Sequence, residues 1–381
     1  MTHAMIFSTL HDSRIDFKLL FASISQYFII QHKIMKHKIT SVLILNIMFC
    51  LFLAGCDKTE TAYESAQKAI EAGDYDTALS VADGAVSASA GDKLIYRARG
   101  IAYLGKGEYE LAEDSFVSAL SCSNGLVESA DVDISYYLAV AEFKKGDIES
   151  AKSTVDAIIA LRPKEDGAYF LRGKIELALK DKEAALADFD KTVELAPSNY
   201  DRYVGIYEEL HAHGYDDDAS AYLTQAMSAG NKLSDYNKGV LEYYLASYTD
   251  AKADLESARQ SQSNENLILY LGRTYEALGD TSYAMTLYND FLRENPSAGA
   301  IYEQLTNCMM KNGDYEGALS TIETGLSVGN GEGSKGMMFD RVVAYEMLYD
   351  FESAKKSIAE YLSVYPDDEV AVRENVFLSS R

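Results

Sequence analysis

Residues 96–116 read YRARGIAYLGKGEYELAEDSF, and this stretch decides the fold of the chain. Gly100 and Tyr103 lie three residues apart, so they share one face of a helix. Gly107 ends that helix, because glycine readily adopts the left-handed backbone that other residues resist. Ala112 and Phe116 lie one turn apart on a second helix, and the small alanine lets the two helices approach closely. The stretch therefore predicts a helical hairpin.

The same hairpin pattern recurs along the chain, and an alanine marks the second helix of each copy. Successive alanines are 32 to 39 residues apart, most often 34. A steady period of this size indicates repeated units, each of which packs on its neighbours. The alanines are Ala78, Ala112, Ala151, Ala185, Ala219, Ala251, Ala284, Ala318 and Ala354. The copies at Ala219 and Ala251 are degenerate in sequence, and about five extra residues near 121–131 predict a longer surface loop.

The prolines test this register independently. All four, Pro163, Pro197, Pro296 and Pro366, lie twelve residues after the alanine of their repeat. Proline cannot continue a helix, because it lacks the N–H group and its ring clashes with the preceding turn. Each proline therefore marks the place where a second helix has ended.

These residues resemble the tetratricopeptide repeat family. The family pattern runs aromatic, Leu-Gly, Tyr, then Ala and Phe, then Pro. It is matched by Tyr96, Gly100, Tyr103, Ala112 and Phe116, and again by Leu271, Gly272, Tyr275, Ala284 and Pro296. The resemblance implies an all-α fold: a right-handed α-solenoid of about nine repeats over residues 61–366, with a capping helix in 367–381. The chain departs from the pattern in having no tryptophan. A related family of hairpin repeats has a slightly longer period, and the steady spacing argues against it.

The apolar residues of the final segment are expected to close the last repeat. A solenoid needs a cap over its terminal apolar face. Val370, Val372, Val376, Phe377 and Leu378 supply apolar surface for this purpose.

Composition and charge exclude several classes of function. The formal net charge of −24 repels phosphate backbones, so nucleic acid is not an expected partner. The cysteines and histidines form no cluster with metal-ligand spacing, and no nucleophile or paired carboxylates stand in a catalytic pattern. We therefore expect neither a catalytic nor a metal site, no cofactor and no enzymatic activity.

The N-terminal part has the form of an export signal. Met35 is followed by basic residues and an apolar run to Leu53, which predicts a signal peptide over residues 35–55. Leu53, Ala54, Gly55 and Cys56 resemble the lipobox of bacterial lipoproteins, which implies lipidation of Cys56 and a location at the outer face of the cytoplasmic membrane. Residues 1–34 then form an upstream extension and 56–60 a linker. The alternative is a transmembrane anchor, which the shortness of the apolar run disfavours.

The family resemblance also implies where a partner binds. The concave face of such a stack is lined by the first helix of each repeat and commonly holds peptides or partner helices. The inward positions in this chain are Tyr136, Phe143, Phe170, Lys174, Tyr236, Tyr243 and Arg273. Aromatic side chains there suit protein recognition, although the same residues also suit packing between repeats. The predicted function is a non-catalytic protein-interaction scaffold. The alternatives are a lipoprotein that binds a glycan or peptide, and a spacer without a specific partner.

Overall fold

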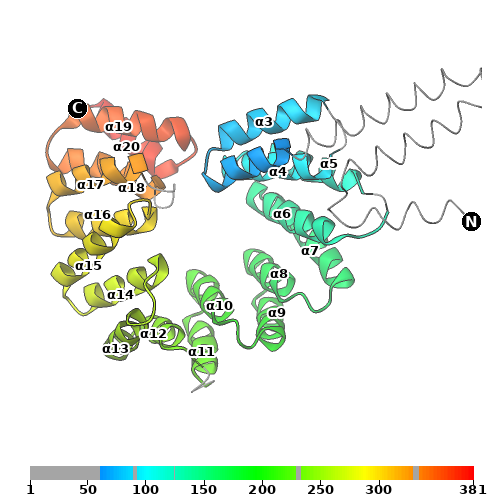
Figure 1. Cartoon of the computed structure of the whole chain (residues 1–381), viewed down its shortest axis with the longest axis horizontal. Coiled ribbons are helices and arrows are strands. Elements are labelled where there is room, and N and C mark those ends of the chain that lie inside the picture. The colour runs from blue at the N-terminus through cyan, green and yellow to red at the C-terminus, as the bar shows by residue number, and fades with distance from the viewer. Residues whose placement is uncertain (1–60, 89–91, 124, 229–232, 329–333) are drawn as a thin grey trace, which may run out of the picture. The chain divides into compact units, whose positions relative to one another are not determined.

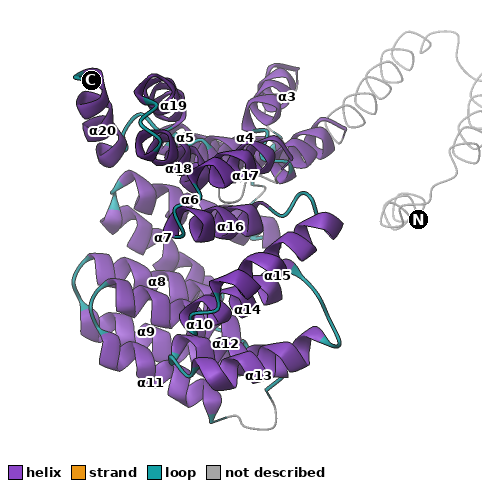
Figure 2. Ribbon diagram, turned by 90° about the vertical axis from the view of Figure 1, so that its left-hand side faces the viewer, coloured by secondary structure: helices purple, strands orange, loops and turns teal. Residues whose placement is uncertain are grey.

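A computed structural model describes residues 61–88, 92–123, 125–228, 233–328 and 334–381. All regular structure in these residues is helical, as Figure 2 shows, and the prediction of an all-α fold is confirmed.

Residues 1–60 lie outside the described part. They include the predicted signal segment, the lipobox residues Leu53, Ala54 and Gly55, and the lipidation site Cys56. No helix within the described ranges has the length and apolar character that a membrane span requires.

The helices alternate as first and second members of hairpins in the unit Tyr63–Arg381. The first helices are residues 61–71, α4 (Lys93–Gly105), α6 (Ser129–Lys145), α8 (Asp166–Ala178), α10 (Tyr200–Ala212), α12 (Asp235–Tyr244), α14 (Glu265–Ala277), α16 (Gly299–Lys311) and α18 (Ser334–Met347). The second helices are α3 (Tyr75–Ala88), α5 (Tyr109–Ser121), α7 (Ile148–Leu161), α9 (Lys182–Leu195), α11 (Asp216–Met227), α13 (Tyr248–Arg259), α15 (Thr281–Glu294), α17 (Tyr315–Val328) and α19 (Phe351–Val364). The described residues thus form nine hairpins, including the two that are degenerate in sequence.

The repeat alanines are the points of closest helix packing. All nine are fully buried. In several hairpins the residue twelve positions before the repeat alanine is a glycine. This glycine lies on the first helix and faces a side chain, usually an aromatic ring, on the second helix. A Cβ atom on Gly100 would lie 2.5 Å from the Phe116 ring, and one on Gly173 would lie 2.5 Å from the Phe189 ring. Phe116 and Phe189 have no exposed surface, so glycine is needed to seat them.

The turns inside the hairpins confirm the expected role of glycine and show an exception. The glycines five residues before the repeat alanines have a positive φ, between 71° and 91°. They are Gly73, Gly107, Gly146, Gly214, Gly279 and Gly313. In the other three hairpins Lys180, Ala246 and Tyr349 take this place with φ of 64°, 58° and 62°. The packing of the two helices therefore holds the turn in a left-handed backbone conformation even where the residue has a Cβ atom and this conformation is unfavourable.

The hairpins stack in the order of the sequence. Each second helix packs on the first helix of the next hairpin, and successive first helices such as α12, α14, α16 and α18 also contact one another. Figure 1 shows first helices α8, α10 and α12 on the inner side of the stack, with second helices α9, α11 and α13 on its outer side. The inner face is therefore formed by the first helices.

The last helix, α20 (Glu369–Ser379), packs on α19, but of the five apolar residues expected to form this contact only Leu378 is buried in it. Ala371 and Leu378 are fully buried in this contact. Val370, Val372, Val376 and Phe377 are instead 43 to 69% exposed, so their expected role as cover for the last repeat was wrong. The reason is helical geometry: positions seven apart, 371 and 378, share the buried face, and the other apolar residues lie outside it.

Two neighbouring carboxyl groups, of Glu346 on α18 and Glu374 on α20, make the contact of α20 with the stack sensitive to pH. Burial, followed by the influence of the neighbouring Glu374 carboxyl on α20, raises the pKa of Glu346 to about 7. Because protonated Glu346 is favoured in the folded chain, it stabilises the fold fully below its ordinary pKa near 4.5. This stabilisation is lost as the pH rises through about 7 and the carboxyl ionises.

We expect Glu346→Gln to be about 1 kcal/mol more stable than the wild type at pH 8, and about as stable at pH 5. The magnitude is discounted because the Glu346 side chain is only partly buried. Chemical unfolding of both proteins at the two pH values measures the difference. An equal difference at pH 5 and pH 8 would show that Glu346 does not titrate in this range.

Candidate functional site

The seven residues predicted to face a partner come from three positions of the repeat. Tyr136, Phe170 and Tyr236 stand fifteen residues before their repeat alanine, Lys174 and Arg273 eleven, and Phe143 and Tyr243 eight. The structure places them on first helices α6, α8, α12 and α14. They divide into one group on α6 and α8 and another on α12 and α14.

The residues on α6 and α8 serve mainly in packing. Tyr136 and Phe143 pack against one core cluster, and Phe170 packs against the next. The Tyr136 hydroxyl is buried and has no hydrogen-bond partner among the described residues, and burial raises the pKa of this phenol. The Phe170 ring lies 6.0 Å from that of Phe189 and is covered by the Arg202 guanidinium at 5.1 Å. Little of this aromatic surface is therefore available to a partner.

Lys174 is engaged within the chain. Its Nζ lies 2.6 Å from a carboxylate oxygen of Glu209 on α10. The same ammonium lies 5.7 Å from the centre of the Phe170 ring. A binding role for Lys174 would require this ion pair to open.

The second group belongs to a larger set of rings, here called the tyrosine cluster: Tyr207, Tyr236, Tyr243, Tyr244, Tyr248 and Tyr270. Three first helices, α10, α12 and α14, contribute five of its members, and α13 contributes Tyr248. Tyr243 is central, because its ring lies 5.4 to 5.8 Å from those of Tyr244, Tyr248 and Tyr270. Edge-to-face contacts of this kind favour a fixed arrangement of the rings.

Hydrogen bonds fix part of the cluster. The Tyr244 hydroxyl donates to Glu208 on α10 at 2.5 Å and lies 3.2 Å from the Tyr270 hydroxyl. Burial raises the pKa of Tyr236 to about 12 and also raises the pKa of Tyr243 and Tyr270. The phenols are therefore neutral at physiological pH and present a partly buried, amphipathic surface.

Arg273 lies beside this cluster on α14. Burial raises the pKa of Tyr243, Tyr270 and Glu303, and the charge of Arg273 offsets part of this rise, which places the guanidinium near all three. Within the described ranges Arg273 has neither a hydrogen bond nor an ion pair. It is thus a half-buried cation whose donors are not used by the described part of the chain.

The sequence prediction missed several residues on the same face. Glu303 stands fifteen residues before its repeat alanine, as Tyr236 does, and Glu208 stands eleven before, as Arg273 does. Tyr270 and Asp340 share the position fourteen residues before. Glu303 and Glu208 could have been predicted from the sequence if the inward repeat positions had been considered for every residue type, and not chiefly for aromatic residues.

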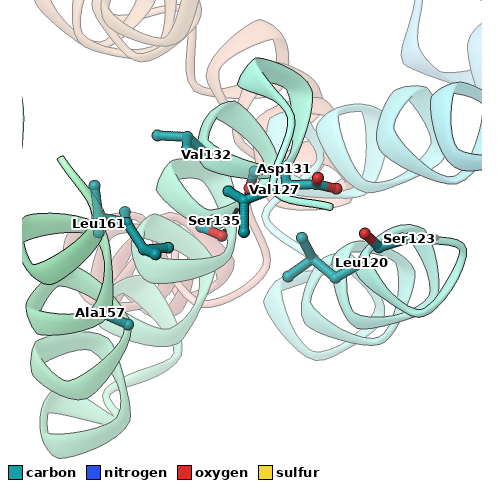
Figure 3. A pocket seen from close by; sticks show the side chains of 9 residues that line it. Leu120, Ser123, Val127, Asp131, Val132, Ser135, Ala157 and Leu161 are labelled. Carbon is teal, nitrogen blue, oxygen red and sulfur yellow. Dashed lines mark hydrogen bonds between the residues drawn. The ribbon is translucent and has the colours of Figure 1, made fainter. Parts of the chain in front are cut away.

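A separate cavity lies where α5, α6 and α7 meet. It has a volume of about 210 Å³ and is lined by Leu120, Val127, Val132, Ile158 and Leu161, among others (Figure 3). Its polar groups are used internally: the Ser135 hydroxyl donates to the Asp131 carbonyl, and the Asp131 carboxylate pairs with Lys93 at 2.6 Å. The cavity is smaller than the roughly 300–1,000 Å³ typical of small-molecule sites.

The described residues offer little for metal or thiol chemistry. Among them no group of three or more His, Cys, Asp or Glu side chains is arranged to hold a metal ion. Cys122 and Cys308 are free thiols. Burial raises the pKa of Cys308 to about 12, which keeps this thiol protonated and unreactive.

Comparison with known families decides the identity of the repeat. A sequence model of the tetratricopeptide repeat matches residues 63–126 and 131–200, and a second model of the same repeat matches 267–298. These matches coincide with hairpins of the structure and with the buried alanines. The chain is a tetratricopeptide repeat protein. Proteins of this family mediate protein–protein interactions, which agrees with the coarse functional prediction.

Several solved structures are similar to this tetratricopeptide repeat protein. MamA from Desulfovibrio magneticus RS-1 is 20% identical, with 45% of this chain and 94% of that chain covered and a TM-score of 0.38. YrrB, described as a TPR protein with an unusual peptide-binding site, is 21% identical over 43% and 82% of the two chains, with a TM-score of 0.34. A tetratricopeptide repeat protein from Parabacteroides merdae is 16% identical over 85% and 100%, with a TM-score of 0.35. No curated protein matches this chain.

Proposed function

We propose that this chain is a lipid-anchored scaffold of the bacterial cell envelope that binds a protein or peptide partner on the inner face of its first helices, and that it performs no chemistry. The observation that carries the proposal is the tyrosine cluster. Six rings from helices α10, α12, α13 and α14 meet on or beside this face, and burial keeps the hydroxyls of Tyr236, Tyr243 and Tyr270 protonated.

The physical properties of this cluster favour a protein partner. Tyrosine offers a large contact area and has few rotatable bonds, so little conformational entropy is lost on binding. Contacts between the rings and the hydrogen bond from Tyr244 to Glu208 already restrict the cluster before a partner arrives. Preorganised aromatic surface of this kind is typical of the residues that contribute most to binding.

The anchoring part of the proposal is supported by sequence alone. Cys56 follows Leu53, Ala54 and Gly55 at the end of an apolar run, which is the arrangement of a lipoprotein signal. A chain with a net charge of −24 is repelled by anionic lipid headgroups, and a covalent lipid overcomes this repulsion.

The test is affinity capture of the full chain from its native membrane fraction, with mass spectrometry of the bound proteins. We expect a specific protein to be recovered and to be lost from the double variant Tyr243→Ala/Tyr270→Ala. We also expect Cys56→Ser to leave the membrane fraction.

The matched control is Tyr283→Ala/Tyr349→Ala, which removes two exposed tyrosines from outside the cluster. It should retain the partner. Recovery of the same protein by the cluster variant would place binding elsewhere on the chain. If no specific protein is recovered, the scaffold function is wrong, and a spacer or a small-ligand binder takes its place.

A further inference from the structure

Two carboxylates without partners extend the inner face beyond the tyrosine cluster. They belong to Glu303 on α16 and Asp340 on α18. Glu303 reaches across to α18, because its carboxylate would collide with a Cβ atom built on Gly336. Gly336 and Asp340 are one helical turn apart, so the two carboxylates lie close together. Among the described residues neither has a hydrogen bond or an ion pair.

The repeat register places these carboxylates on the same face as the cluster. Glu303 has the repeat position of Tyr236, and Asp340 has that of Tyr270. Arg273 links the two regions, since its charge acts on Tyr243 and Tyr270 as well as on Glu303. Helices α12, α14, α16 and α18 contact one another in order, so the rings and carboxylates form one continuous strip.

The carboxylates are poorly compensated within the described part of the chain. Burial raises the pKa of both, and the neighbouring Asp340 raises that of Glu303 further. The cations of α16 and α18 are occupied: Lys311 pairs with Glu276 at 3.4 Å, Lys335 with Asp368 at 3.0 Å and Arg341 with Glu360 at 2.5 Å. Partly buried charges of this kind are stabilised when an opposite charge is brought to them.

We propose that the partner is a basic peptide segment, with an arginine or lysine that pairs with Glu303 and Asp340 and an apolar residue that packs on Tyr236, Tyr243 and Tyr270. This inference rests on the proposed function, since it names the chemistry of the segment that the inner face binds. The rings beside the carboxylates add cation–π attraction for the same charge. The net charge of −24 attracts a basic partner at long range.

An acidic segment fits this surface less well. Arg273 alone would attract it, while the carboxylates of Asp201 and Glu208 on α10 and of Glu303 and Asp340 would repel it. Arg202 and Lys174 on the same side already pair with Asp166 and Glu209. The balance of unpaired charge on the strip is therefore negative.

The test uses three synthetic nine-residue peptide pools that differ at one position. Each pool has two fixed leucines, and the residue between them is arginine, glutamine or glutamate, with all other positions randomised. Fluorescence anisotropy measures binding to the full chain at low salt. We expect the arginine pool to bind about tenfold more tightly than the glutamine pool, the value of one well-placed charge pair.

The variant Glu303→Gln/Asp340→Asn should abolish this preference. Its control is Glu149→Gln/Glu183→Gln, which removes the same charge from exposed sites on second helices α7 and α9 and should keep the preference. Circular dichroism verifies that both variants fold.

Equal binding of the three pools, tighter binding of the glutamate pool, or a preference that survives in Glu303→Gln/Asp340→Asn would each overturn the inference. If Tyr243→Ala/Tyr270→Ala still weakens all three pools equally, the inner face binds peptides and only the basic preference is wrong. If no pool binds, the inference that the partner is a basic segment is wrong. The proposed function is then tested separately, by the affinity-capture experiment.

Discussion

Replacing Gly272 with alanine should lower the free energy of unfolding by about 2–3 kcal/mol, the upper part of the roughly 1–3 kcal/mol typical when an extra methyl group is forced into a packed core. A Cβ atom at this position would overlap the ring of Tyr288 on α15. Tyr288 is fully buried, and its hydroxyl donates to Glu276 at 3.0 Å, so the ring has no free space to move into. Denaturant unfolding of the two proteins measures the loss.

Gly84→Ala is the matched control for this prediction. Gly84 lies within α3, and a Cβ atom there meets no atom within 4 Å. The substitution should raise stability by up to about 1 kcal/mol, because alanine favours helix over glycine. If Gly272→Ala behaves like Gly84→Ala, the close contact between α14 and α15 is not as tight as the structure indicates.

Replacing Arg172 with methionine should cost about 3 kcal/mol of stability. Arg172 on α8 makes two hydrogen bonds to Asp188 on α9, at 2.6 and 2.7 Å, and one to Asp156 on α7, at 2.6 Å. Asp188 is only 5% exposed, so the substitution leaves a buried carboxylate without its partner. Removing one member of a buried ion pair typically costs about 3–5 kcal/mol, and the partial exposure of Arg172 favours the lower end.

Arg293→Met provides the comparison for an exposed ion pair. Arg293 pairs with Asp290 one turn earlier on α15, and 75% of its side chain is exposed. Its loss should change stability by less than about 0.5 kcal/mol. If the two variants are equally stable, Arg172 does not hold the three helices together. Rescue of Arg172→Met by a second substitution, Asp188→Leu, would identify the unpaired carboxylate as the cause.

The fold could be predicted from the sequence because a few residue types recur at fixed positions. The buried alanines, the turn glycines and the prolines each have a single physical reason for their place, and those reasons do not depend on distant parts of the chain. Hairpins that lack the turn glycine show the strength of this register. Ala246 and Lys180 take a backbone normally reserved for glycine, and their hairpins form nevertheless.

The candidate site was less predictable, because the register gives the direction of a side chain and not its surroundings. Tyr136 and Tyr243 both occupy inward positions. The Tyr136 hydroxyl is enclosed by its neighbours, whereas Tyr243 stands among other tyrosines. Likewise, the sequence offered Lys174 and Arg273 as equivalent cations, but Lys174 is paired and Arg273 is not paired within the described ranges. These differences depend on contacts between repeats, which vary from one interface to the next.

The stacking of each hairpin on the one before it also bears on how the chain acquires its structure. The helices that share extensive contacts are neighbours or next neighbours in sequence. Low contact order of this kind is associated with rapid folding, since no segment has to find a partner far along the chain. During synthesis, each hairpin that emerges can therefore dock on a completed predecessor. Its apolar face then stays exposed only for the time needed to produce the next thirty or so residues.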